Sequence, residues 1–266
     1  MAPLRGRWTD LTTTDFDRID PARTVTVLPL GAIEQHGPHL PLDTDARIAE
    51  GILDAAWAHL APDLPLLTLP PVRVGMSAEH ARFPGTLSAD TETLTRYLTG
   101  IGESVAAAGV SKLVLLNAHG GQTHVLDAAA LDLRRQQGML AVKANYFGFG
   151  VPADLVADHE IEHGLHGGLI ETAMMLHLAP EAVRMDRAGD FASLRADMAA
   201  SHRYLRPGNR SGFAWLAEDL NAHGVAGNAA GADAGTGARL VDHFARALAT
   251  LIAETAAFDM ARLGGR

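Results

Sequence analysis

Cysteine is absent from this chain of 266 residues. Without thiols there are no disulfide bonds, thiolate metal sites or cysteine nucleophiles, so a tightly held metal would need nitrogen and oxygen ligands. Positive charge is also scarce, because 22 Lys and Arg stand against 31 Asp and Glu, with a formal net charge of -9. No cluster of basic residues offsets this locally, and nucleic-acid binders depend on such clusters. We therefore expect no nucleic-acid partner.

Long apolar runs are lacking as well. No segment approaches the ~20 consecutive apolar residues of a membrane-spanning helix. The opening sequence, MAPLRGRWTD, carries charges with no apolar stretch behind it, so we expect no secretory signal, no membrane anchor and a cytoplasmic location. Apolar residues make up 47% and charged residues 20% of the chain, which is the balance of a folded globular protein. At this length we expect a single domain over residues 1–266.

Segments with the patterns of strands and helices alternate along the chain. Apolar and β-branched runs predict strands at residues 24–30, 66–69, 112–116 and 139–145. Helical spacing predicts a helix that starts near residues 43–45 and further helices at residues 91–108, 125–137, 168–178 and 238–257. This alternation predicts an α/β fold with three layers, α/β/α, around a mostly parallel central sheet. Ligands of such sheets bind outside the carboxyl ends of the strands.

The first group of candidate metal ligands follows the first predicted strand and consists of Glu34, His36 and Asp45. Residues two apart in an extended loop project to the same side, and Asp45 enters from the start of the next helix. One imidazole and two carboxylates suit zinc, manganese or iron(II), and a carboxylate placed here can bridge two ions. The alternative is that Glu34 and Asp45 are solvated loop and helix-cap residues and that His36 is merely polar. Asp43 is a better candidate than Asp45 for the helix cap.

The second group lies in the segment NAHGGQ, at the exit of the predicted strand 112–116. Two strand exits then aim ligand-type residues at one rim of the sheet. We predict that His119 ligates the metal and that Asn117 orients a ligand or the substrate by its amide. The two adjacent glycines suit a backbone that passes close to another group or adopts positive φ, although a tight connection explains them too.

The third group lies in HEIEHGLHGGLIET, residues 159–172. An unpaired carboxylate is costly to bury in an apolar helix, so we expect Glu171 to ligate metal, with a salt bridge to an arginine as the rival interpretation. His166 precedes two glycines and can shuttle a proton, because imidazole titrates near neutral pH. His163 is the alternative shuttle, and the sequence does not choose between them. Backbone N–H groups near Gly167 are candidates to stabilise an oxyanion.

One more loop, residues 75–86, carries GMSAEHARFPGT. We predict that it forms a wall of the substrate site, with Ser77 as a binding residue, although a surface turn explains its Pro and Gly equally well. Ser77 is not a predicted nucleophile, because no elbow motif surrounds it.

Four blocks of this sequence resemble the creatininase family, the creatinine amidohydrolases and their relatives. They are LPLGAIEQHGPHLPLDTD (28–45), GMSAEHARFPGT (75–86), NAHGGQ (117–122) and HGGLIETAMM (166–175). The resemblance implies an α/β domain with a metal centre at the carboxyl edge of a parallel sheet, usually in a homohexamer. It also implies one or two divalent ions per subunit, zinc or manganese with iron as a third choice, on ligands at Glu34, His36, Asp45 and His119.

Gly121 departs from the pattern of creatininase itself, which has a glutamate two positions after the strand-exit histidine, within Asn-Gly-His-Tyr-Glu-Asn. In relatives that share the glycine, the glutamate of the ET motif, here Glu171, is the replacement ligand. This departure weighs against creatinine itself as the substrate. Relatives of this kind include a formamide hydrolase of riboflavin and deazaflavin synthesis and a peptide hydrolase of the mycofactocin pathway.

We therefore predict a metal-dependent amidohydrolase that cleaves a C–N bond of a small, possibly cyclic amide. One or two ions would lower the pKa of water toward ~7 and polarise the carbonyl, and His166 or His163 would protonate the departing nitrogen. The alternatives are a formamide or peptide hydrolase of a cofactor pathway, a ligand-binding protein without turnover, and a metal-dependent isomerase or lyase.

Overall fold

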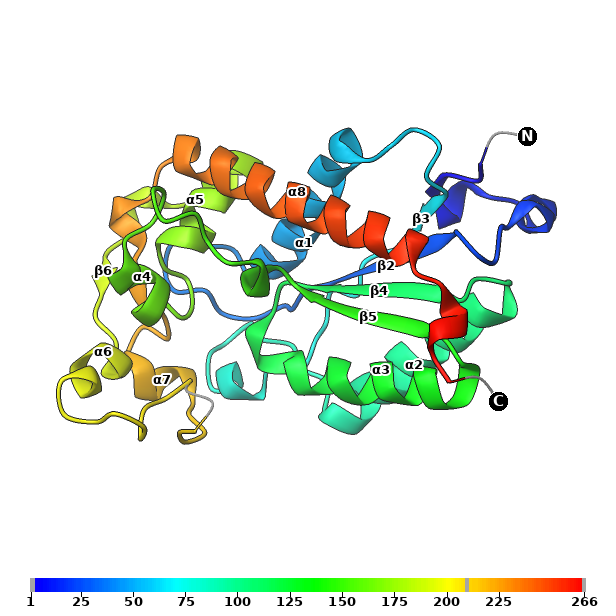
Figure 1. Cartoon of the computed structure of the whole chain (residues 1–266). Coiled ribbons are helices and arrows are strands. Elements are labelled where there is room, and N and C mark those ends of the chain that lie inside the picture. The colour runs from blue at the N-terminus through cyan, green and yellow to red at the C-terminus, as the bar shows by residue number, and fades with distance from the viewer. Residues whose placement is uncertain (1–2, 209–210, 265–266) are drawn as a thin grey trace.

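The structure is a computed structural model that describes residues 3–208 and 211–264. At its centre lies a five-stranded sheet in the order β1-β3-β2-β4-β5, and every pairing in it is parallel. Its strands are β1 (Gly6–Arg7), β2 (Val25–Leu30), β3 (Leu66–Thr68), β4 (Lys112–Asn117) and β5 (Leu140–Asn145). Helices cover both of its faces (Figure 1), which confirms the predicted three-layer α/β/α fold.

Side-chain alternation along β2 divides the core into two hydrophobic clusters. Val25 and Val27 pack against α1 (Thr44–Ala56), α5 (Leu169–Leu178) and α8 (Ala234–Ala257). On the opposite face, Leu28 and Leu30 pack against α2 (Thr91–Ala107) and α3 (Thr123–Gln137). Both faces of the strand are buried, which explains its almost uninterrupted apolar sequence.

The five predicted helices and four predicted strands are all present, with small shifts at their ends. The largest shift is in α8, predicted from residue 238 and observed from Ala234. Asp233 caps this helix by accepting the N–H of Thr236 at 2.9 Å, so the helix begins inside the Gly- and Ala-rich stretch NAAGADAGTGA (228–238).

Strand β1, at the edge of the sheet, was not predicted from the sequence. Other short helices and strands that the sequence did not reveal gather at one end of the molecule, opposite the end that holds both termini (Figure 1). They are α4 (Asp158–His163), α6 (Leu194–Ala199), α7 (Ala217–Leu220) and the antiparallel pair β6 (Asp190–Phe191) and β7 (Gly227–Asn228). Among the described residues, no helix has both the length and the apolar character needed to cross a membrane.

The strand order determines where a ligand can bind. From β2 the chain moves to β3 on one side and then crosses to β4 on the other, so the direction of winding reverses between β2 and β4. Open α/β sheets bind ligands at such a reversal, outside the carboxyl ends of the strands. Leu30 and Asn117 are paired at these two ends. Gly31 follows directly, and a Cβ there would overlap the backbone of Ala46 in α1, so glycine lets α1 start close to the sheet.

Candidate metal centre

Six ionisable side chains converge beyond the carboxyl ends of β2 and β4. They form three groups, and within each group the candidate ligand atoms lie within 4.8 Å of one another. The groups are Glu34, His36 and His166; Glu34, Asp45 and His119; and His36, Asp45 and Glu171. The structure thus brings together all five residues that the sequence suggested as metal ligands, and it adds His166.

Asp45 lies between two of these groups. Its Oδ1 is 3.1 Å from His36 Nε2, and its Oδ2 is 3.4 Å from His119 Nδ1. Because its two oxygens face different groups, the carboxylate suits a bridge between two ions about 3.5–4 Å apart. The residue belongs to the first turn of α1, where free N–H groups favour negative charge.

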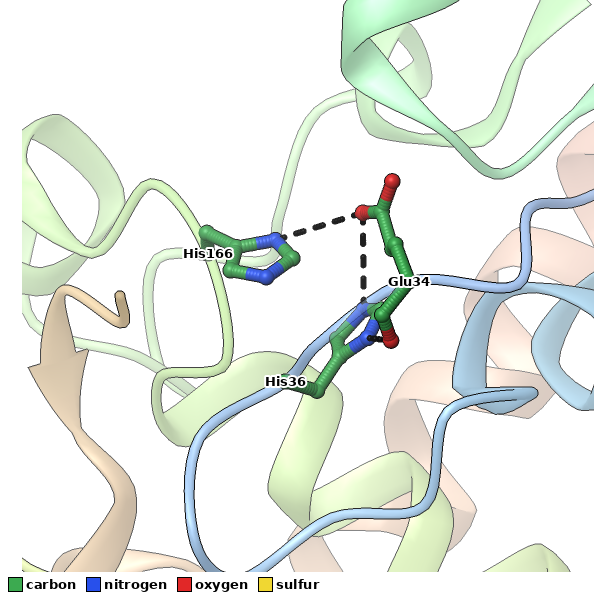
Figure 2. Close-up of side chains that lie close together, drawn as sticks. All are labelled: Glu34, His36 and His166. Carbon is green, nitrogen blue, oxygen red and sulfur yellow. Dashed lines mark hydrogen bonds and ion pairs between the residues drawn. The ribbon is translucent and has the colours of Figure 1, made fainter. Parts of the chain in front are cut away.

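Glu34 is fully buried, and neither of its carboxylate oxygens has a hydrogen-bond partner. The rings of His36 and His166 face this carboxylate from two sides (Figure 2), with His166 Nδ1 3.7 Å from Oε1. The Oδ2 atom of Asp45 is likewise buried and unpartnered. Uncompensated buried carboxylates are costly, and no Lys or Arg within the described part of the chain forms an ion pair with either residue. These oxygens fit a cation.

Backbone carbonyls determine how three imidazole rings of the cluster are oriented. A carbonyl oxygen only accepts hydrogen bonds, so the ring nitrogen that faces it carries a proton. Each ring donates in this way: His36 Nδ1 to Glu34 at 3.1 Å, His119 Nε2 to Met76 at 2.9 Å and His166 Nε2 to Gln35 at 2.7 Å. In a neutral ring the second nitrogen then presents a lone pair, and in all three rings that nitrogen faces the carboxylates.

The lone pairs of His36 Nε2 and His119 Nδ1 lie 3.1–3.4 Å from carboxylate oxygens of Glu34 and Asp45, and at such distances a proton or a cation is needed between the two atoms. Within the polypeptide alone, protons take this place: burial lowers the pKa of His36, but Asp45, Glu171 and Glu34 raise it to about 10. Burial also lowers the pKa of His119, but the neighbouring carboxylates of Glu34 and Asp45 together have the larger effect and raise it well above its usual value. Metal ligation requires these nitrogens without their protons. A divalent cation would therefore replace the protons, and the donor set fits one.

Glu171 approaches the same cluster from α5. Its Oε2 is 3.9 Å from His36 Nε2 and accepts the N–H of Gly167 at 2.6 Å. Among the described residues no arginine forms an ion pair with it, so the predicted salt-bridge alternative is not seen. The Gly167 N–H is engaged by this carboxylate and is not free for an oxyanion. Burial raises the pKa of Glu171.

Asn117 and Ser77 both contact His119, and both are fully buried. The Asn117 amide donates to the carbonyl of His119 at 2.7 Å and to Asn145 Oδ1 at 2.9 Å. Its oxygen accepts the His119 N–H at 3.0 Å and Gln122 Nε2 at 2.9 Å. The whole amide is in use, so it orients the histidine loop and has no group left for substrate. Ser77 Oγ lies 3.5 Å from His119 Nε2 and does not line the cavity described next.

A cavity of about 660 Å³ opens beside the cluster. Its polar lining includes Glu34, Asp45 and Glu171. Its larger apolar and aromatic lining residues are Tyr146, Phe147, Val151, Ile161, Leu165, Ile170, Trp215 and Phe244. No Lys or Arg lines it among the described residues.

His166 lines this cavity, whereas His163 does not. His163 ends α4, where its Nε2 is 3.8 Å from Glu162 and its ring packs against His159. Of the two histidines between which the sequence could not choose, only His166 belongs to the cluster.

Glu79 and His80 also line the cavity, although sequence reasoning gave them no role of their own. The space for Glu79 exists because residue 121 is glycine: a Cβ at Gly121 would overlap Glu79 Oε1. Gly121 is therefore the one feature of the sequence that could have indicated a side chain, here Glu79, packed against this position. His80 is buried, and its ring lies 4.3 Å from that of His166 between centroids.

Comparison with known proteins gives one family. The model of the creatininase family, described as creatinine amidohydrolase, matches residues 9–252, which include every residue of the cluster. The chain is 38% identical over 200 residues to a mycofactocin precursor peptide peptidase of Mycobacterium tuberculosis, over 72% of this chain and 73% of that protein. It is 30% identical over 198 residues to a creatinine amidohydrolase of Pseudomonas putida, over 68% and 75% respectively.

Solved structures agree with this result. A mutant creatininase of the Zn–Zn type gives a TM-score of 0.74 at 25% identity, over 93% of this chain and 97% of that one. A manganese creatininase gives 0.71 at 24% identity, over 93% and 97%. The two share the fold of the present chain.

Proposed function

Because the chain belongs to the creatininase family, whose members are metal-dependent hydrolases of C–N bonds, we propose that it hydrolyses an amide C–N bond at the cluster around Asp45. The observation that carries this proposal is the set of three rings whose acceptor nitrogens face buried, unpartnered carboxylates. Imidazole and carboxylate ligands suit zinc and manganese, and solved creatininases hold these metals. The shared position of Asp45 supports two ions per subunit.

The residues of the cluster divide into metal holders and a proton carrier. The holders would be Glu34, His36, Asp45, His119 and Glu171. A divalent ion, when bound, lowers the pKa of water toward ~7 and polarises the amide carbonyl.

His166 is the proton carrier. Burial lowers its pKa to about 4, so the ring is neutral at pH 7. Its Nε2–H stays on the carbonyl of Gln35, and Nδ1 is therefore free to accept the proton of the attacking water. The same nitrogen then returns this proton to the departing amine.

The cavity supports a substrate with an apolar group beside the scissile amide. Aromatic and aliphatic side chains make up much of its lining, and the lining that the structure describes has no Lys or Arg. Phosphate recognition commonly uses Arg or Lys. Among the alternatives raised by the sequence, a peptide or another apolar amide therefore matches the cavity better than a phosphate-bearing formamide, and creatinine, whose apolar groups are one N-methyl and one ring methylene, would cover only a small part of the apolar lining.

Metal analysis of the purified protein followed by amide assays tests the proposal. We expect at least one zinc or manganese ion per chain, hydrolysis that chelation abolishes and added metal restores, and one oxygen from ¹⁸O-labelled water in the acyl product. The assay panel contains creatinine, formamides and short peptides with polar or apolar flanking residues. Full activity in metal-free protein, or a product without water-derived oxygen, would contradict it; the second result would favour an isomerase or lyase.

Three broader properties belong to the same proposal. We propose one domain, because both hydrophobic clusters share a single sheet, and limited proteolysis should release no stable half. We also propose a homo-oligomer, with a hexamer expected from the family resemblance, and sedimentation measures its mass. A cytoplasmic location completes the proposal, and cell fractionation tests it.

A further inference from the structure

The side-chain amide of Gln35 has only one possible orientation. Its Oε1 accepts the N–H of Gly37 at 2.9 Å, and its Nε2 donates to the carbonyl of Gly224 at 2.6 Å. An amide oxygen only accepts and an amide nitrogen only donates, so these two backbone groups decide which end is which. The same nitrogen is 2.8 Å from His80 Nδ1. His80 Nδ1 must therefore be the acceptor of this hydrogen bond.

His80 consequently carries its proton on Nε2. A neutral imidazole has one donor and one acceptor nitrogen. The ring is only 1% exposed and lies against that of His166, which disfavours a second proton. The Nε2 atom is directed at Glu34, whose Oε1 is 3.5 Å away.

Four imidazole nitrogens surround Glu34 Oε1, and they are not equivalent. Their distances from this oxygen are 3.2 Å for His119 Nδ1, 3.5 Å for His80 Nε2, 3.7 Å for His166 Nδ1 and 4.0 Å for His36 Nε2. Three of them present lone pairs when the rings are neutral, because their partner nitrogens donate to carbonyls. When all four rings are neutral, only His80 presents a hydrogen to the carboxylate.

We propose that His80 is a positioning residue for Glu34 and not a metal ligand. Its Nε2–H faces Oε1 at 3.5 Å and restrains the orientation in which the carboxylate meets the cation, and Gln35 sets the tautomer that places a hydrogen on this nitrogen. This inference rests on the metal centre of the proposed function. Outer-sphere partners of metal ligands change metal affinity by about 10–100-fold when they are removed.

The variants His80→Gln and His80→Leu separate the effect of the N–H donor from that of the volume of the ring. A glutamine amide nitrogen reaches the position of Nε2 and keeps a donor there, whereas leucine has none. We expect the dissociation constant for zinc, measured by competition with a chromophoric chelator, to rise about 10–100-fold in His80→Leu and by less than about fivefold in His80→Gln. His124→Leu, an exposed histidine of α3, is the matched control and should bind zinc as the parent does. Equal weakening in the Gln and Leu variants would overturn the proposal.

Neutron diffraction from the unmutated, zinc-loaded protein gives a second test that does not depend on a variant that folds. We expect deuterium on Nε2 of His80, none on its Nδ1, and no zinc on either nitrogen. A purely structural role would not require this tautomer. Zinc bound to the cluster with deuterium on Nδ1 of His80, or with zinc on His80 itself, would overturn this inference alone. A failure of the unmutated protein to bind zinc would overturn the proposed function together with it.

Discussion

Strand β4 carries a buried polar residue at its start and is followed by another just beyond its end, and the two are satisfied in different ways. At the first residue, Lys112 is fully buried, and its ammonium group donates to two backbone carbonyls at the end of α8, at 2.7 and 2.8 Å. Beyond the last residue, His119 meets the carboxylates of Glu34 and Asp45, where three oxygens have no hydrogen-bond partner.

The difference distinguishes a buried charge that serves the fold from one that serves a ligand. The last carbonyls of a helix lack partners within it and favour a nearby cation, so Lys112 and α8 satisfy each other within the chain. At the other edge of the sheet, three carboxylate oxygens of Glu34 and Asp45 have no hydrogen-bond donor. Buried polar atoms without partners are rare in folded proteins and call for a missing group, and here the missing group is a cation.

Of the changes that test this difference between the two ends of β4, loss of Asp45 should have the largest effect on metal binding and activity. The change Asp45→Ala removes the carboxylate shared by two ligand groups, so we expect loss of bound metal and a fall in activity beyond the ~100-fold that outer-sphere changes cause. Elemental analysis and amide hydrolysis measure both. Asp43→Ala is the control, because this neighbouring carboxylate pairs with Arg47 outside the cluster. Full activity in a metal-free Asp45→Ala protein would refute the account.

Metal removal should have the next largest effect. A metal present at about 100 times its dissociation constant stabilises the folded state by about 2.7 kcal/mol, which for a chain of this size corresponds to a shift in Tm of roughly 5–10 °C. Scanning calorimetry with and without chelator measures the shift. Added zinc should leave the Tm of Asp45→Ala unchanged, and an equal rise in that variant would place the bound metal elsewhere.

Lys112→Met should disturb only the other end of the strand. Two buried carbonyls lose their donor, so we expect a loss of about 1–3 kcal/mol in the free energy of unfolding, measured by denaturant titration. Metal content and activity per folded molecule should not change. Lys143→Met replaces an exposed lysine of β5 and should stay within about 0.5 kcal/mol of the parent. Reduced metal content in Lys112→Met would contradict the separation of the two ends.

The smallest effect concerns protons at the metal centre. In the chain alone the pKa of His36 is raised to about 10, so at pH 7 metal binding should release roughly one proton or more, and affinity should rise with pH until about 10. Calorimetry in two buffers of different ionisation enthalpy counts these protons. In metal-free protein the stabilisation from this ring is complete below about pH 6.5 and is lost as pH rises through about 10. A binding enthalpy independent of the buffer would contradict this assignment.

The fold and the convergence of the candidate ligands could be predicted because local patterns determine them. Apolar runs located β2 and β4, and parallel strands end at one edge of a sheet, so Glu34 and His119 could be expected to meet. Short elements such as α4 and β7 lack a recognisable period. Their positions depend on long-range contacts, for example the Glu160 carboxylate, which accepts the N–H of Leu169 at 2.8 Å and that of Asn228 at 2.9 Å.

The finer roles could not be predicted, because they depend on which hydrogen bonds are already made. Asn117 is a polar residue at a strand exit, yet its amide is fully used by its own loop. The Gly167 N–H is taken by Glu171. The tautomer of His80 follows from Gly224, which contacts Gln35 across 189 positions of sequence. No local pattern reports such a contact.

The most direct test of the central claim is anomalous diffraction at the zinc edge from crystals of the metal-replete protein. We predict a strong peak within coordination distance of Asp45, His36 Nε2 and His119 Nδ1, with a second peak on the other side of the Asp45 carboxylate if two ions bind. No peak at this position, with the two imidazoles turned away from each other, would contradict the account.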